Sequence, residues 1–176
     1  PSFARKFQVA LECGMHVLLE GPQGCGKTVM TRAMARALGL EYVYFNCSAV
    51  RDSSEFMASL QVIAGPSGQS ITTFLKSAPL LAIEAATADP SRRFVLFLDE
   101  LNRSGEEARN VLTSALDSTR RIFNPIRNAD EIIPANLQVV AAVNRGREFS
   151  GTYAIDAAQH DRFCTLSVWY PPAEEE

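Results

Sequence analysis

Apolar residues follow two different spacings along the chain, and segments of one kind alternate with segments of the other. Continuous apolar runs of about four to eight residues predict buried strands, and apolar residues three or four positions apart predict helices that pack by one face. The predicted strands are HVLLE (16–20), EYVYFN (41–46), RFVLFLDE (93–100), NLQVVAAVN (136–144) and RFCTLSVWY (162–170). The predicted helices span residues 3–11, 29–38, 52–60, 78–88, 108–116 and 155–159.

Residues that end helices or form turns separate these segments. Gly39 and the pair Asp89-Pro90 stand where two helical patterns end, and Ser77 is placed to cap the helix that follows it. The stretch AGPSGQS (64–70) is the most loop-like in the chain. Strands that alternate with helices predict an α/β fold, a three-layer αβα sandwich around a mostly parallel sheet.

Composition narrows the class of protein. The 176 residues suit a single domain over 1–176 that ends in a polar tail, PPAEEE (171–176). A net charge of -3 gives no basic footprint for nucleic acid, although a local basic patch stays possible. Four cysteines without a CxxC pair favour reduced thiols, so we expect a cytoplasmic protein. No apolar run approaches the roughly 20 residues of a membrane span, and no secretory signal is visible.

The strongest chemical signal is GPQGCGKT (21–28), which follows the first predicted strand and precedes a helix. It fits the phosphate-loop pattern G-x-x-x-x-G-K-[ST], in which main-chain N–H groups and a helix N-terminus cradle phosphates. The lysine would reach the outer phosphates and the threonine hydroxyl would ligate Mg²⁺. The residues expected to contact the nucleotide here are Gly21, Pro22, Gln23, Gly24, Cys25, Gly26, Lys27, Thr28 and Val29.

Two acidic residues close the strand RFVLFLDE, and they suggest hydrolysis as well as binding. Asp99 is placed to hold Mg²⁺ together with Thr28, because the carboxyl end of a parallel strand abuts the phosphate loop. Glu100 follows at once and points in a different direction, since strand side chains alternate. We therefore expect Glu100 to polarise the water that attacks the terminal phosphate.

Two further polar residues are candidates for the catalytic site. Asn144 ends an otherwise apolar strand and is expected at the same sheet edge as Asp99, where its amide can orient water or touch the phosphate. Arg162, between a short helix and the last strand, can act as an arginine finger on a neighbouring subunit or serve as a surface charge. Of the two histidines, His16 is expected at a strand edge near the nucleotide and His160 beside the finger.

These motifs together resemble the core of AAA+ ATPases, with GPQGCGKT as Walker A, FVLFLDE as Walker B, Asn144 as sensor 1 and Arg162 in DRF as the finger. The finer pattern is similar to the MoxR and dynein-related branch, which tends to write DE-x-NR, as DELNR (99–103) does here. The stretch VNRGREFSGTYAIDAAQHDRF (143–163) matches that branch as well. Arg103 is a second candidate for contact with a neighbouring subunit, with a role as a surface charge as the alternative.

The resemblance implies further structure. It implies a five-stranded sheet in the order 5-1-4-3-2, a hairpin insert at AGPSGQS and a second hairpin within 120–138. It also implies a C-terminal helical lid, which the chain lacks after YPPAEEE. Weak nucleotide affinity and poor hydrolysis are therefore expected of the chain as given.

The resemblance also implies a function. The leading hypothesis is a ring ATPase that uses ATP and Mg²⁺ to remodel or activate a protein partner. By family resemblance the ring is expected to be a hexamer, and von Willebrand factor A proteins are the expected partners. One alternative is a nucleotide-gated scaffold with little turnover, and another is the GTP-using motor subunit of a restriction-type system. A small-molecule kinase is disfavoured because no substrate lid is visible. A Ras-type GTPase is disfavoured because the chain lacks N-K-x-D.

Overall fold

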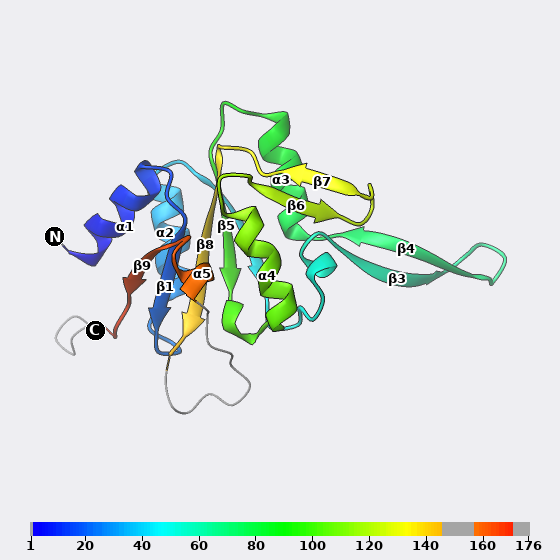
Figure 1. Cartoon of the computed structure of the whole chain (residues 1–176), viewed down its shortest axis with the longest axis horizontal. Helices are drawn as coiled ribbons and strands as arrows, with labels where there is room; N and C mark the ends of the chain where they lie inside the picture. Colours follow the sequence, from blue (N-terminus) through cyan, green and yellow to red (C-terminus); the bar gives the residue numbers. More distant parts are fainter. Residues whose placement is uncertain (1, 146–156, 171–176) are drawn as a thin grey trace.

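A parallel sheet of five strands forms the centre of this computed structural model, which describes residues 2–145 and 157–170 (Figure 1). Its strands are β1 (Val17–Gly21), β2 (Glu41–Asn46), β5 (Phe94–Asp99), β8 (Leu137–Asn144) and β9 (Cys164–Ser167). Their order across the sheet is β2-β5-β8-β1-β9, and every neighbouring pair is parallel. Counted along the chain as five core strands, this is the expected order 5-1-4-3-2, so the predicted fold is confirmed.

Helices cover both faces of the sheet and make the structure a three-layer sandwich (Figure 1). The helices are α1 (Phe3–Glu12), α2 (Lys27–Ala37), α3 (Ala78–Ala88), α4 (Glu106–Ala115) and α5 (Ala157–His160). Because strand side chains alternate, Val17 and Leu19 pack in the α1 and α2 layer while Leu18 packs in the α3 and α4 layer. Both faces are buried, which explains why these strands read as continuous apolar runs.

The carboxyl ends of three strands meet at one edge of the sheet, the lower edge in Figure 1. Gly21 at the end of β1 is in register with Asn144 at the end of β8. Asp99 at the end of β5 is in register with Asn46 of β2. Parallel pairing therefore brings the phosphate-loop motif, the acidic pair and the candidate sensor to the same edge, where ligands of open α/β sheets bind.

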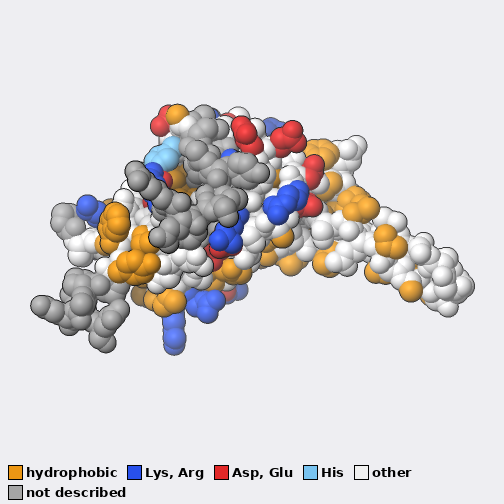
Figure 2. All heavy atoms as spheres, turned by 90° about the horizontal axis from the view of Figure 1, so that it is seen from below, with side chains coloured by type: hydrophobic (Ala, Val, Ile, Leu, Met, Phe, Trp, Pro, Cys, Tyr) orange, Lys and Arg blue, Asp and Glu red, His pale blue; other side chains and the backbone are white. Residues whose placement is uncertain are grey.

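Two antiparallel hairpins interrupt the alternation of helix and strand. They are β3 (Ala58–Ala64) with β4 (Ser70–Lys76), and β6 (Arg121–Asn124) with β7 (Ala129–Ile132). Both match the hairpins that the resemblance implies. The first hairpin projects from the body as an arm (Figure 1), and Figure 2 shows apolar side chains along it. Six of them are exposed, namely Leu60, Val62, Ile63, Ile71, Phe74 and Leu75.

The predicted helix over 52–60 is wrong. A capping box between Asp52 and Glu55 starts only a 3-10 turn, η1 (Ser53–Phe56), and β3 begins two residues later. The chain turns from helix to strand here because the following residues pair with β4 rather than with their own helix. The last predicted strand is also shorter than expected, since β9 ends at Ser167.

Some predictions fall on parts of the chain that the structure does not describe. Residues 146–156, which make up much of the stretch that matches the MoxR branch, lie outside the described residues, as does the tail 171–176. Residues 157–159 of the short helix predicted over 155–159 belong to α5. Residues 155 and 156 of that prediction lie outside the described part. Within the described residues, no helix is long and apolar enough to cross a bilayer.

His16 lies at the amino end of β1, the edge opposite the phosphate-loop motif, so its expected position near a nucleotide is wrong. The ring is buried at 8% exposure, and its Nδ1 accepts a hydrogen bond from Val139 N at 3.0 Å. Burial, assisted by the nearby Arg120 charge, lowers the pKa of His16 from 6.5 to about 4. The neutral ring is therefore a structural link between β1 and β8.

Candidate functional site

The loop between β1 and α2 needs glycine for two different physical reasons. Gly24 and Gly26 have φ of 77° and 89°, a left-handed backbone that side chains other than glycine rarely adopt. Gly21 instead has a neighbour too close for any side chain, because a Cβ there would lie 2.1 Å from the carbonyl oxygen of Val168. Gly24 and Gly26 therefore set the course of the loop, and Gly21 lets the chain after β9 pack against the loop base.

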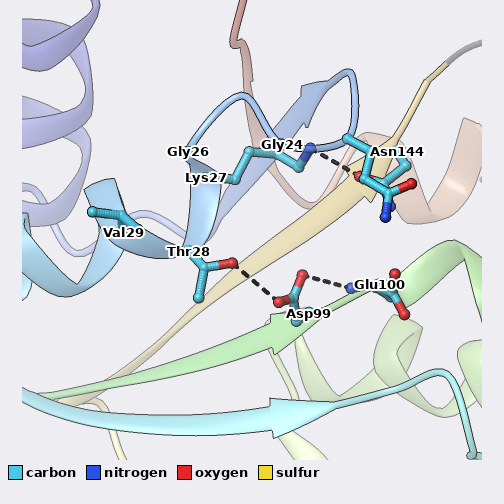
Figure 3. Close-up of a pocket in the computed structure, with 9 residues that line it drawn as sticks. Gly24, Gly26, Lys27, Thr28, Val29, Asp99, Glu100 and Asn144 are labelled. Atoms are coloured by element: carbon cyan, nitrogen blue, oxygen red, sulfur yellow. Dashed lines mark hydrogen bonds between the residues drawn. The ribbon is translucent and has the colours of Figure 1, made fainter. Parts of the chain in front are cut away.

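Lys27 is the first residue of α2 and its side chain turns back into the loop (Figure 3). Its Nζ donates to Gly21 O at 3.0 Å, to Pro22 O at 2.8 Å and to Asn144 Oδ1 at 2.9 Å. The residue is only 7% exposed. The three N–H groups of the ammonium thus each have an oxygen partner, and one of the partners is the amide of the candidate sensor residue.

Asp99 lies opposite the start of α2 and presents its carboxylate to three hydrogen-bond donors. Thr28 Oγ1 donates to Oδ2 at 3.1 Å, and Glu100 N donates to Oδ1 at 3.0 Å (Figure 3). Tyr44 OH, from the neighbouring strand β2, also donates to Oδ2, at 3.4 Å. A hydroxyl and a carboxylate that meet in this way are hard oxygen ligands of the kind that Mg²⁺ prefers. The donor set of Thr28 and Asp99 therefore fits the metal that the sequence predicts.

Glu100 has φ of 54°, a left-handed conformation that is uncommon for a residue with a side chain. This turn ends β5 and starts the 3-10 turn η2 (Leu101–Arg103). The Glu100 carboxylate accepts a hydrogen bond from Arg103 Nη1 at 3.3 Å. Unusual backbone of this kind concentrates at functional sites, and here it sends the side chains of Asp99 and Glu100 in different directions.

A pocket of about 340 Å³ lies between the loop and the ends of β5 and β8. The residues that line it were all predicted to contact nucleotide, metal or water: Gln23, Gly24, Gly26, Lys27, Thr28, Val29, Asp99, Glu100 and Asn144. The other three predicted loop residues do not line it. Gly21 and Pro22 act through carbonyls that hold Lys27, and Cys25 is buried behind the loop with its Sγ 3.7 Å from Lys27 Nζ.

Arg162 does not line this pocket. Its Nε donates to Thr113 O of α4 at 3.0 Å, and its side chain lies beside Leu101, Leu112 and Phe163. Within one chain the structure therefore does not bring Arg162 to the residues around Lys27. An arginine that acts on a neighbouring subunit is expected to lie outside its own chain's pocket, so its role stays a prediction.

Two residues that sequence reasoning did not single out also contact the site. Tyr44 reaches Asp99 from β2, and Asn102 binds the main chain of Asn144 with its amide, at 3.0 Å and 3.4 Å. Tyr44 stands two positions before the end of β2, on the face it shares with Asn46, which is the one signal that could have indicated it. Asn102 lies within DELNR, but its partner is a main-chain group, which leaves no pattern in the sequence.

Comparisons with known proteins give a family and a fold. A family model described as "AAA domain (dynein-related subfamily)" matches residues 16–163. An uncharacterized protein of Staphylococcus aureus is 29% identical over 157 residues, and one of Staphylococcus haemolyticus is 27% identical; each alignment covers 88% of this chain and 56% of the relative. A crystal structure of a candidate ATPase from Cytophaga hutchinsonii has a TM-score of 0.65 at 21% identity, over 96% of this chain and 46% of that one. The chain thus spans about half the length of these relatives.

Proposed function

The chain belongs to the dynein-related subfamily of AAA domains, and from that premise we propose that it binds ATP with Mg²⁺ at the carboxyl edge of its sheet and hydrolyses the terminal phosphate. One observation carries the proposal: the phosphate loop, the acidic pair and Asn144 line one pocket, although they come from three separate strands. The volume of about 340 Å³ suits the phosphates.

Binding of a phosphate group requires Lys27 to exchange partners. In the structure its ammonium is fully engaged by two carbonyl oxygens and the Asn144 amide. A phosphate oxygen carries more negative charge than any of these, so it can displace at least one of them with a gain in electrostatic energy. The amide is the partner that can rotate away, and its release would leave the Asn144 side chain free to bind water or phosphate.

Thr28 and Asp99 would hold Mg²⁺, which would offset the negative charge of the phosphates. Glu100 would accept a proton from the water as its oxygen attacks the terminal phosphorus and the bond to the bridging oxygen of ADP breaks. For this the Glu100 carboxylate has to part from Arg103, its present partner at 3.3 Å. That ion pair is only partly buried, so its loss is a small cost.

We propose further that hydrolysis drives the remodelling or activation of a protein partner by a ring of subunits, as in the MoxR branch, with a hexamer and a von Willebrand factor A adaptor as the expected forms. The DELNR motif supports the branch. The position of Arg162 outside its own pocket supports a role in a neighbouring subunit's site. All four cysteines are free thiols, which supports a reducing, cytoplasmic compartment.

A second candidate is a nucleotide-gated scaffold with little turnover. The Arg103–Glu100 contact favours it, because the carboxylate has to leave Arg103 before it can accept a proton from water. Use of GTP by a restriction-type motor is a third candidate, since the pocket residues would contact the phosphates, which ATP and GTP share.

Phosphate release with ATP or GTP and Mg²⁺ tests the proposal. For ATP we expect slow turnover in the wild type and a decrease of about 10²- to 10⁴-fold in Glu100→Gln, with ATP binding retained. Glu107→Gln makes the same charge change at an exposed position of α4 and should leave turnover unchanged. Equal rates in wild type and Glu100→Gln would remove Glu100 as the base, and binding without turnover in the wild type would favour the scaffold.

A further inference from the structure

We propose that Asn102 is a positioning residue, which fixes the main chain of Asn144 relative to the turn that carries Glu100. This inference rests on the proposed function, because it concerns how the hydrolytic water is held. It starts from the way the sheet ends at its carboxyl edge. The pairing of β5 with β8 stops at Leu98 and Ala141, whereas β8 continues to Asn144.

The end of β8 therefore has one side without a strand partner. In a parallel strand, the N–H and C=O of one residue point toward the same neighbour, and those of the next residue point to the other side. Arg145 N donates to Gly21 O on the β1 side at 3.1 Å. The N–H and C=O of Asn144 consequently face the β5 side, where β5 has already ended.

The side chain of Asn102 takes the place of the missing strand. Its Nδ2 donates to Asn144 O at 3.0 Å, and its Oδ1 accepts from Asn144 N at 3.4 Å. A primary amide holds its N–H donors and its carbonyl acceptor in one plane, so one side chain can bind both the N–H and the C=O of Asn144. Asn102 is only 5% exposed, which shields both bonds from competing water.

The same short turn carries Glu100 and Asn102. Arg103 N donates to Glu100 O at 2.9 Å and Ser104 N donates to Leu101 O at 3.2 Å, so the turn is closed by its own hydrogen bonds. Asn102 thereby ties this turn to the main chain of Asn144, while the Asn144 side chain stays available to Lys27. The arrangement sets the separation between the expected base and the amide that would orient its water.

Two substitutions separate positioning from stability. Asn102→Asp keeps the shape and the acceptor for Asn144 N, but replaces the donor with an oxygen that faces Asn144 O. Asn136→Asp is the matched control, because Asn136 Nδ2 also binds main-chain oxygens, those of Ala86, Asp89 and Arg92, but at the amino edge of the sheet. Both variants lose an amide donor to the main chain, and only the first does so beside the pocket.

We expect Asn102→Asp to lower kcat for ATP hydrolysis by about 10- to 100-fold, since a displacement of about 1 Å is enough for such a loss. The Kd for ATP should change by less than about twofold, because the phosphate loop is untouched. Asn136→Asp should lower the melting temperature and leave kcat unchanged. An unchanged kcat in Asn102→Asp, or a parallel fall of kcat and affinity in both variants, would overturn the inference.

A second readout does not depend on hydrolysis. In nucleotide-free protein, hydrogen exchange of the Asn144 amide should be at least about 10-fold faster in Asn102→Leu than in the wild type, because the leucine cannot accept its N–H. The amide of Val140 inside β8 should exchange at the wild-type rate. Equal exchange of the Asn144 amide in Asn102→Leu and in the wild type overturns the positioning role of Asn102. Absence of turnover in the wild type overturns only the proposed function.

Discussion

A side chain at Gly21 would clash with the main chain at the base of the phosphate loop. Gly21→Ala would place Cβ 2.1 Å from Val168 O and 3.1 Å from both Val168 C and Cys25 Sγ. Separation by more than an ångström is needed to restore ordinary contact, and the nearest atom is main chain, which cannot rotate away. The segment after β9 must therefore move, and it is held to β1 by the bond from Val168 N to Glu20 O at 2.7 Å.

The expected cost can be compared with a second glycine in the same loop. Overpacking in a core costs about 1–3 kcal/mol, and a clash between main-chain atoms belongs at the upper end, about 3 kcal/mol. Gly26→Ala meets nothing within 4 Å and pays only for its φ of 89°, about 1–2 kcal/mol. At about 2–4 °C per kcal/mol, Gly21→Ala should melt about 6–12 °C lower than the wild type.

Hydrogen exchange distinguishes the two mechanisms, because they act at different places. Gly21→Ala should release the Val168 amide by separating it from Glu20, whereas Gly26→Ala should leave that amide protected. Both should weaken ATP binding. A Gly21→Ala protein that melts within about 1 °C of the wild type and keeps Val168 protected would refute the packing argument.

The remaining predictions concern the metal ligands and the buried histidine. Thr28→Val should raise the Mg²⁺ concentration needed for half-maximal hydrolysis by about 10-fold or more, measured by metal titration, since it removes one of two expected ligands. Tyr44→Phe removes only a 3.4 Å bond to Asp99, so the same titration should shift by about threefold at most. The neutral form of His16 is favoured by folding, because its pKa falls from 6.5 unfolded to about 4 folded. Its contribution to stability is therefore full above about pH 6.5 and is lost as the pH falls toward 4, by about 3 kcal/mol. Urea unfolding should show a steeper pH dependence for the wild type than for His16→Asn, which can still accept from Val139 N; equal slopes would contradict the shifted pKa.

The sequence was sufficient for those features that leave a periodic or local pattern. The five core strands are apolar on both faces, and the phosphate loop is fixed by glycines and a lysine at set spacing. The strands β3 and β4 were not predicted from apolar runs, because they form a projecting hairpin in which Leu60, Val62 and Phe74 are exposed. Continuous apolar runs mark strands that are buried, and the strands of this arm are largely exposed.

Other features of the site depend on distant main chain and could not be predicted. The clash that excludes a side chain at Gly21 comes from Val168, and the bonds of Asn102 go to the backbone of Asn144. The error at His16 was avoidable, because a residue that precedes β1 lies at the amino edge of a parallel sheet, whereas the loop follows the strand. In a parallel sheet, a polar residue that precedes a strand lies at the amino edge, and one that follows a strand lies at the carboxyl edge, where ligands bind.

Lys27, in the pocket opposite Asp99, is expected to bind the phosphates of a nucleotide. Calorimetric titration of ATP and Mg²⁺ into the wild type, Lys27→Met and Lys6→Met, each below its melting temperature, tests it most directly. Lys6 is an exposed lysine of α1 and provides the matched loss of charge. We expect one saturable site in the wild type and Lys6→Met, with affinity at least about 10-fold weaker in Lys27→Met. Equal affinity in all three proteins would contradict it.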